Sequence, residues 1–297
     1  MSEVLDALGP VEAMAPPRAG ARWAGLLRHP GAVAGLVVLV CCLLFVVVGP
    51  WLTPYAPTAV VPADRLQGPS LAHPLGTDNL GRDLLSRLAS GGRLSLLMGS
   101  LATLLAAGIG GAVGLVSGFY RGRVDFAMQR AVDVLLVLPP LVLALSIATV
   151  AGEGLKGVVI AITLVSGPTY ARVVRAAALS VMGNEYIAAA RALGASDARI
   201  MLRHTLPNAL PPILVQVSFG LGTTLLLASG LGFLGLGVQP PTPEWGSMLS
   251  EGRSYISAAP YLTTFPGLAI ALTVLAFNLL GDGLRDVLDP RHSARLD

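Results

Sequence analysis

The sequence predicts an all-α integral membrane protein with about six transmembrane helices, and three observations support this fold class. Hydrophobic residues fill 54% of the 297 positions and charged residues only 12%, whereas a typical soluble domain has about 25% charged residues. The mean hydropathy is +0.71. Several apolar runs reach or approach the roughly 18–20 residues that cross a bilayer, and they are continuous rather than alternating, which excludes a lipid-embedded β-barrel.

Apolar runs place the six spans in chain order. We expect the first transmembrane helix within 30–52, with its apolar run at 30–50, and the others at 95–119, 131–151, 155–171, 208–237 and 262–280. Prolines inside four of them predict kinks that neighbouring helices can accommodate. They are Pro139 and Pro140, Pro168, Pro211 and Pro212, and Pro266. The glycine-rich fifth run is expected to be bent or broken.

The basic residues predict the orientation, because Arg and Lys are enriched in short cytoplasmic connections. If the N-terminus lies inside, most of the 20 basic residues fall on the inner side. We therefore expect a cytoplasmic N-terminal tail at 1–29, a helical core at 95–283 and a cytoplasmic C-terminal tail at 284–297. The first run is too long for the apolar part of a signal peptide, so it is expected to stay as an anchor.

The first outer connection, residues 53–94, contains HPLGTDNLGRDLLSRLASGG. Its leucines at 80, 84 and 88 have helical spacing, Thr77 or Asp78 could cap a helix start, and the glycines at 91 and 92 could end it. Asp83 and Arg87 could pair one turn apart. These features predict a short amphipathic helix lying at the outer interface.

Motifs for chemistry by this chain alone are missing from the sequence. GLGFLG at 230–235 matches a dinucleotide fingerprint in letters, but it closes an apolar run instead of opening a soluble helix. The four histidines lie far apart, so no metal site is expected. The adjacent Cys41 and Cys42 lie inside the first span and have no partner cysteine elsewhere. We expect no cofactor, no metal and no nucleic-acid binding.

Small residues recur every fourth position in the second span, ending with Gly110, Gly114 and Gly118 after Ala102 and Ala106. Such a line lets another helix backbone approach closely. We interpret it as helix packing.

Residues 185–207, EYIAAARALGASDARIMLRHTLP, form the longest basic connection on the expected inner side. Gly194 is expected to end a first helix with left-handed backbone, and Ser196 to cap a second one with Asp197 in its first turn. The first helix has one apolar stripe, formed by Tyr186, Ala189, Ala190 and Leu193.

The second helix of this connection is expected to end at Pro207. Arg199 and Arg203, one turn apart, would share a face. On these residues alone, the two helices could rest on anionic lipid or dock onto another protein.

A known family shares this connection and further stretches of the chain. HPLGTDNLGRDLLSRLASGGRLSL (73–96), YARVVRAAAL (170–179), FLGLGVQPPTPEWGSML (233–249) and NLLGDGLRDVLDPR (278–291) resemble the second permease subunit of ATP-binding-cassette (ABC) importers for dipeptides, oligopeptides and nickel. AAARALG at 188–194 and HTLP at 204–207 resemble the E-A-A-x-x-x-G and L-P parts of the cytoplasmic EAA loop of such permeases. The chain departs from that pattern at Ala188, where the motif has glutamate. Glu185, one turn earlier, is a candidate replacement.

The resemblance implies a type I ABC importer permease fold, with the permease core at 95–283 and a coupling loop at 184–207. It implies a bacterial cytoplasmic (inner) membrane protein with several spans and both termini in the cytoplasm. The chain would be a translocation subunit and not an enzyme. Its expected partners are a homologous second permease subunit, two ATPase subunits or domains that hold ATP and Mg, and an extracytoplasmic substrate-binding protein. The substrate would be a di- or oligopeptide or a related small solute, moved by alternating access.

The resemblance and the residues together give three sets of candidate functional positions. The expected ATPase-coupling residues are Glu185, Tyr186, Ala188, Ala189, Ala190, Arg191, Gly194, Ser196, Asp197, Arg199, Arg203 and Pro207. Candidates for the pathway lining are Gln216, Ser218, Thr223, Thr224 and Asn278, for which interhelical hydrogen bonding is the other interpretation. Candidates for docking the binding protein are Asp78, Arg82, Asp83, Arg87, Pro241 and Trp245.

The residues alone leave two other functional classes open. An ion-coupled secondary transporter or channel would act without an ATPase, but it usually carries charged groups at mid-membrane depth. The spans here carry almost none, and Asp133 and Asp282 lie at their ends. A membrane-embedded hydrolase would need a paired nucleophile and base within the spans, and none is evident.

Overall fold

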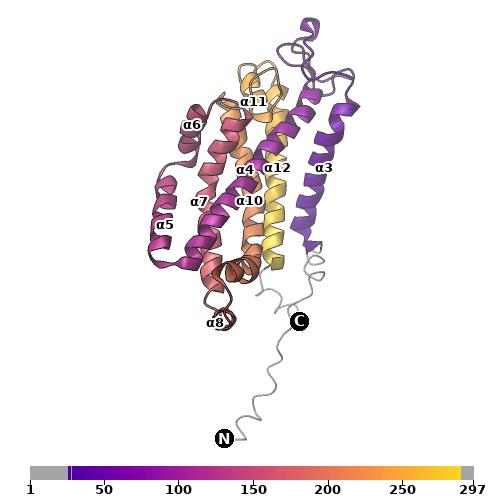
Figure 1. Ribbon diagram of the computed structural model, residues 1–297. Helices are drawn as coiled ribbons and strands as arrows, with labels where there is room; N and C mark the ends of the chain where they lie inside the picture. Colours follow the sequence, from indigo (N-terminus) through magenta and orange to yellow (C-terminus); the bar gives the residue numbers. More distant parts are fainter. Residues whose placement is uncertain (1–25, 28, 289–297) are drawn as a thin grey trace.

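The computed structural model describes residues 26–27 and 29–288, and this part of the chain is a bundle of helices without strands (Figure 1). Most of the two predicted tails, residues 1–25, 28 and 289–297, lies outside the described residues. The long helices are α3 (Pro30–Leu52), α4 (Leu84–Tyr120), α5 (Gly122–Val137), α6 (Pro140–Ala151), α7 (Leu155–Val181), α10 (Leu206–Phe233) and α12 (Tyr261–Leu288). The shorter elements are η1 (Pro62–Asp64), α8 (Glu185–Ala192), α9 (Asp197–Arg199), the π-helical η2 (Ile200–Thr205) and α11 (Trp245–Arg253).

Five helical segments of the described chain are long and apolar enough to cross a bilayer. They are α3, α4, α7, α12 and the continuous run Asp197–Phe233 that α9, η2 and α10 form together. Helices α5 and α6 pass the same test only as a pair, bent by 96° at Pro139 and Pro140. The prediction of about six spans is therefore confirmed, with the third span broken at the predicted kink.

The fifth span was expected to be bent or broken, and the structure shows that it is not broken. Helix α10 continues through Pro211 and Pro212 and ends at Phe233. A proline in a helix interior removes one backbone N–H donor, and a helix embedded among neighbours can tolerate that loss. α10 packs against α4, α7 and α12, which accounts for its continuity.

The prediction of a short outer helix around residues 77–92 is wrong. Residues 77–83 form a turn, and α4 begins at Leu84 and continues through Gly91 and Gly92 as one helix of 37 residues. These glycines mark close packing and not a helix end: a Cβ at Gly92 would lie 2.6 Å from the Trp245 ring. Asp83 is the N-cap, because its carboxylate accepts a hydrogen bond from the Ser86 N–H at 2.7 Å.

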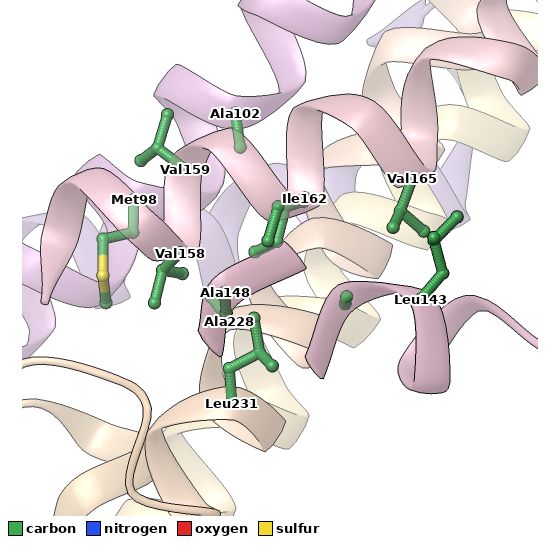
Figure 2. Close-up of a cluster of buried hydrophobic side chains, with 12 residues drawn as sticks. Met98, Ala102, Leu143, Ala148, Val158, Val159, Ile162, Val165, Ala228 and Leu231 are labelled. Carbon is green, nitrogen blue, oxygen red and sulfur yellow. The ribbon is translucent and has the colours of Figure 1, made fainter. Parts of the chain in front are cut away.

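The main apolar core lies where α4, α6, α7 and α10 meet (Figure 2). Met98 and Ala102 come from α4, Ala148 from α6, Ile162 from α7 and Leu231 from α10. All five side chains are buried. The core therefore fixes the four helices that carry the candidate sites at either end of the bundle.

The line of small residues on α4 lies against α7, and we call this contact the α4–α7 seam. A Cβ at Gly110 would overlap the carbonyl oxygen of Gly167, and a Cβ at Gly114 would overlap that of Ala171. A Cβ at Gly118 would lie 2.8 Å from the Cβ of Ala178. The two backbones approach as closely as the glycines allow, which is the packing that the sequence predicted.

The two ends of the bundle differ in what they carry (Figure 1). At one end, the His29 Nε2 atom at the start of α3 lies 3.1 Å from the Asp286 carboxylate near the end of α12, and the loop of α8 and α9 lies at this same end. We call it the α8 end. The connection between α3 and α4 and helix α11 lie at the opposite end, the α11 end.

Candidate functional site

The connection between α7 and α10 forms a compact helical loop at the α8 end. Helix α8 ends in a Schellman motif: the Ala195 N–H donates to the Ala190 carbonyl at 3.1 Å, and the Gly194 N–H donates to the Arg191 carbonyl at 3.0 Å. Gly194 has φ of +80°, a conformation that costs glycine little because it has no Cβ. The chain therefore reverses sharply after α8, as the glycine predicted.

The second arm of the loop starts as predicted and continues further than expected. The Ser196 Oγ accepts a hydrogen bond from the Arg199 N–H at 3.4 Å and caps α9. The chain then widens into the π-helical turn η2 and passes directly into α10. Pro207 does not end this arm, because it lies in the first turn of α10, where the Leu206 N–H donates back to Met201 across five residues. A proline without an N–H fits at a helix start.

A small buried cluster braces the loop against the bundle. Ile187 from α8 and Ile200 from η2 are both buried, and they pack with Phe119 of α4 and Val181 of α7. The Arg191 guanidinium lies 5.9 Å from the centre of the Phe119 ring. Ile187 is therefore the anchor of α8, although it lies outside the apolar stripe that the sequence emphasised.

The apolar stripe itself faces away from the bundle. Leu193 is 89% exposed and Tyr186 is 44% exposed; Ala189 is exposed as well, and Ala190 is half-buried. Tyr186 is held from below by Asn208, whose Nδ2 lies 3.3 Å from the tyrosine oxygen. The loop thus presents an ordered apolar surface that its own chain does not cover.

The charged residues of the loop surround this surface. Within the described residues, none of them takes part in an ion pair; they are Glu185, Arg191, Asp197, Arg199 and Arg203. All five are exposed. The structure therefore brings the twelve predicted coupling residues together at the α8 end, eleven on one small, braced loop and Pro207 at the start of α10.

Of the candidate pathway residues on α10, only Thr224 forms a side-chain hydrogen bond to another helix among the described residues. The buried Thr224 hydroxyl lies 2.7 Å from that of Thr103 and 3.0 Å from the Gly99 carbonyl, so it links α10 to α4. Ser218 and Thr223 donate to carbonyls one turn back on their own helix. Gln216 accepts a hydrogen bond at its backbone carbonyl from the Tyr170 hydroxyl at 3.4 Å.

Asn278 differs from the other four because it lines an open groove between α10 and α12, with a volume of about 620 Å³. No charged side chain lines this groove. Ser229 lines it as well, and its buried hydroxyl has no hydrogen-bond partner among the described residues. A role of these polar residues in the pathway stays a prediction, and for Thr224 the observed bonds favour interhelical packing.

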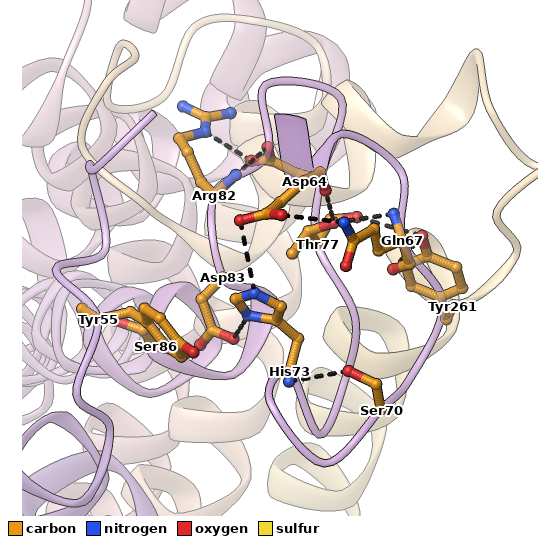
Figure 3. A network of polar contacts seen from close by, with 11 residues as sticks. Tyr55, Asp64, Gln67, Ser70, His73, Thr77, Arg82, Asp83, Ser86 and Tyr261 are labelled. Carbon is orange, nitrogen blue, oxygen red and sulfur yellow. Dashed lines mark hydrogen bonds and ion pairs between the residues drawn. The ribbon is translucent and has the colours of Figure 1, made fainter. Parts of the chain in front are cut away.

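Four of the six residues expected to dock a binding protein, Asp78, Arg82, Asp83 and Arg87, belong to a buried network of ion pairs at the α11 end, which we call the outer frame. The Arg82 Nε lies 2.5 Å from the Asp78 carboxylate. The Glu251 carboxylate of α11 accepts hydrogen bonds from the Nη2 atoms of Arg82, at 2.7 Å, and of Arg87, at 2.9 Å. Asp83 pairs with His73 at 2.9 Å and not with Arg87 (Figure 3). Buried charges are retained where they are paired in this way.

Burial corrects the docking assignment. Asp78, Arg82, Asp83, Arg87 and Trp245 are each at most 4% exposed, so their side chains cannot touch a partner in this structure. The Trp245 indole N–H donates instead to the Leu88 carbonyl at 2.8 Å. Of the six candidates, Pro241 alone is exposed. The outer frame holds surface segments in place without forming the surface.

Glu244 belongs to the same end and carried no signal in the sequence. It caps α11, and its fully buried carboxylate accepts hydrogen bonds from the Gly246 and Ser247 N–H groups and from the Ser95 hydroxyl, each at 2.8 Å. Burial raises the pKa of Glu244, and these hydrogen bonds act in the opposite direction. Sequence reasoning missed Glu244 and Glu251, because their partners Ser95 and Arg87 on α4 lie 149 and 164 positions away.

Comparisons with known proteins identify the family of this chain. A family model described as a binding-protein-dependent transport system inner membrane component matches residues 110–293. The chain belongs to this family. A second model, the N-terminal TM domain of oligopeptide transport permease C, matches residues 20–69. The membership confirms the resemblance seen in the sequence and identifies the chain as a membrane permease component with several spans.

Named relatives of this transport family cover nearly the whole chain. The dipeptide transport system permease protein DppC of Escherichia coli is 46% identical over 275 residues, 91% of this chain and 92% of that protein. The glutathione transport system permease protein GsiD of Pectobacterium atrosepticum is 45% identical over 274 residues, 91% of this chain and 90% of that protein. The DppC protein of Alkalihalophilus pseudofirmus is 44% identical over 266 residues, 90% and 88% of the two chains.

Solved structures of similar chains show which fold this chain has. A chain from an inward facing conformation of the MetNI methionine ABC transporter matches with a TM-score of 0.58 and 20% identity, covering 68% of this chain and 96% of that chain. A second crystal form of that transporter gives a TM-score of 0.56 and 22% identity, with the same coverage. The predicted type I ABC importer permease fold is confirmed.

Proposed function

We propose that this chain is one of two permease subunits of a bacterial ABC importer that moves di- or oligopeptides, or related small solutes, into the cytoplasm. The relatives named for dipeptide and glutathione transport support this class of substrate. ATP and Mg belong to two partner ATPase subunits or domains. An extracytoplasmic binding protein delivers the substrate, and the two permeases expose the pathway to either side in turn.

The α8–α9 loop is the observation that carries this proposal. It presents Tyr186 and Leu193 outward among unpaired charges, while Ile187 fixes its inner face to α4 and α7. An exposed apolar surface that is braced from behind is typical of a protein-docking site. The loop connects α7 to α10, so displacement of the loop moves two helices that line the core. We assign this loop as the docking site of the ATPase subunits.

The orientation follows from the same proposal. In this proposal the α8 end faces the cytoplasm. The contact between His29 and Asp286 supports the same side for both termini, because α3 starts and α12 ends at the α8 end. Both termini are then cytoplasmic. The α11 end faces the extracytoplasmic space.

Co-purification tests this docking site with a matched pair of variants. Leu193 and Val150 are both 89% exposed, but only Leu193 belongs to the loop. The tagged chain, isolated from its native membrane in mild detergent, should bring a second permease and the ATPase subunits with it. Leu193→Gln should lose the ATPase subunits and keep the second permease, whereas Val150→Gln should keep both.

The same preparation separates the importer from an ion-coupled transporter acting alone. Reconstituted complex should take up solute only with ATP and the binding protein. A wild-type chain that elutes alone and transports without ATP would overturn the proposed function.

A further inference from the structure

The connection between α3 and α4 contains a tight turn that holds a leucine in solvent. The Ser70 N–H donates to the His73 carbonyl at 2.8 Å, and the His73 N–H donates to the Ser70 hydroxyl at 3.1 Å, so residues 70–73 are closed in both directions. Leu71 lies at the tip of this turn and is fully exposed. Scattered exposed leucines are common. A leucine fixed on a doubly closed turn calls for a further explanation.

The turn is anchored to the outer frame (Figure 3). His73 is buried; its Nδ1 lies 2.9 Å from the Asp83 carboxylate, and its ring lies 4.6 Å from that of Tyr55. On the other side, the Gln67 carbonyl accepts hydrogen bonds from the Thr77 N–H and the Tyr261 hydroxyl, both at 2.9 Å. Leu71 is therefore preorganised, and a partner that buries it has little ordering cost to overcome.

The connection that carries the turn indicates what kind of partner fits. Between residues 53 and 72 the only charged side chains are Asp64 and Arg65, and the Asp64 carboxylate is engaged by the Gln67 amide at 2.9 Å. Val60 and Val61 are exposed as well. The connection rises beyond the ends of the spanning helices at the α11 end, so a helix buried in the bilayer does not reach it (Figure 1). These features favour a soluble protein surface with an apolar pocket as the partner.

We propose that Leu71 is a docking knob for the extracytoplasmic binding protein, which inserts the leucine into an apolar pocket on its own surface. This inference rests on the proposed function, because it takes the α11 end to face the compartment where the binding protein acts. It replaces direct docking through Arg82 and Asp83, whose role becomes the support of the turn.

Photo-crosslinking in the native host identifies what touches the knob. A photoreactive amino acid at position 71 should give one major adduct, whose second component is a solute-binding protein, whereas the same amino acid at Ile256, also exposed after α11, should not. An adduct with the second permease, or with lipid only, would overturn the proposal.

The contribution of Leu71 to the affinity for the binding protein is measured through the stimulation of ATP hydrolysis by the protein that the crosslink identifies. In the purified complex, Leu71→Asp should raise the half-saturating concentration of binding protein by about tenfold or more and leave the maximal rate unchanged, because burial of a leucine side chain is lost. Leu71→Met should retain the wild-type concentration, since it keeps an apolar side chain of similar volume.

The outcomes separate this inference from the proposed function. A wild-type complex that the binding protein does not stimulate contradicts the importer itself. A stimulated complex in which Leu71→Asp has no effect, or lowers only the maximal rate, contradicts the docking knob and leaves the importer standing.

Discussion

Gly194 has a backbone conformation that other residues rarely adopt, and the loop depends on it. With φ of +80° it lets the Ala195 N–H donate to the Ala190 carbonyl, and α9 starts three residues after Gly194. No heavy atom lies within 4 Å of where a Cβ would be, so space does not restrict this position. The restriction is the backbone angle alone.

Gly194→Val should therefore disable coupling without preventing membrane insertion. A β-branched residue in left-handed backbone costs about 1–3 kcal/mol, which is enough to rearrange an exposed loop. We expect binding-protein-stimulated ATP hydrolysis to fall to the basal level while the amount of chain in the membrane stays unchanged. Gly194→Asn, which tolerates the same angle, is the control and should retain most of the activity. Wild-type transport by the valine variant would contradict the role of the bend.

Arg93 compensates for a proline in the first span. Pro50 lacks the N–H that would bond the Val46 carbonyl one turn earlier in α3. Arg93 of α4 donates to that carbonyl at 3.0 Å through Nε and to the Val47 carbonyl at 2.7 Å through Nη2, and its guanidinium lies 5.6 Å from the Trp51 ring centre. The side chain therefore joins α3 to the rest of the bundle.

A double-mutant cycle tests this compensation. Arg93→Met should lower the Tm of the detergent-purified chain, since a bond from a charged donor to an otherwise unpaired carbonyl is worth about 1–3 kcal/mol. Pro50→Ala restores the backbone N–H, so the same Arg93→Met change should cost less in that background. Equal costs in both backgrounds would show that Arg93 acts elsewhere.

At the scale of elements, the α4–α7 seam and the groups that fix helix ends decide the arrangement. Periodicity and proline placement were sufficient to predict the spans and the break at Pro139 and Pro140. Gly91 and Gly92 misled the helix assignment because the sequence cannot tell a glycine that ends a helix from one that packs against Trp245. The π-helical turn before Pro207 depends on tertiary packing of Ile200, and no local pattern predicts it.

The seam gives a prediction with an internal control on the same helix. Gly114→Leu should abolish folding, because its Cβ would overlap the Ala171 carbonyl and a backbone cannot move aside as a side chain can. Gly108, also on α4, has no heavy atom within 4 Å of a Cβ position, so Gly108→Leu should be tolerated. Size-exclusion profiles of the two variants in detergent measure the difference. A monodisperse Gly114→Leu protein would mean that α4 and α7 can separate.

At the scale of the whole molecule, the sequence predicted the helical loop of α8 and α9 but not the burial of the outer frame. The loop could be predicted because Gly194, Ser196 and the arginines act within one short segment. The outer frame could not, because Arg82 and Arg87 meet Glu251 across more than 160 positions and are buried by that contact. A charge pattern alone shows which residues can pair, and only the fold shows whether the pair is accessible.

Accessibility to membrane-impermeant thiol reagents tests the orientation. Cys41 and Cys42 are the two cysteines of the chain, so their replacement by alanine gives a clean background. In intact cells, Leu71→Cys should be labelled and Leu193→Cys should not, and inverted vesicles should reverse the result. Labelling of both positions from the same side would contradict the assigned orientation of the bundle.

The α4–α7 seam also has a mechanical consequence. Since the two backbones are in close contact along the glycines, sliding α7 past α4 would make them overlap, and we expect the pair to move as one body. Three residues, 182–184, join α7 to α8, so a pull on the loop acts directly at one end of that body. At 1.5 Å per residue, the 27 residues of α7 form a lever about 40 Å long, on which a tilt of about 10° displaces the far end by about 7 Å.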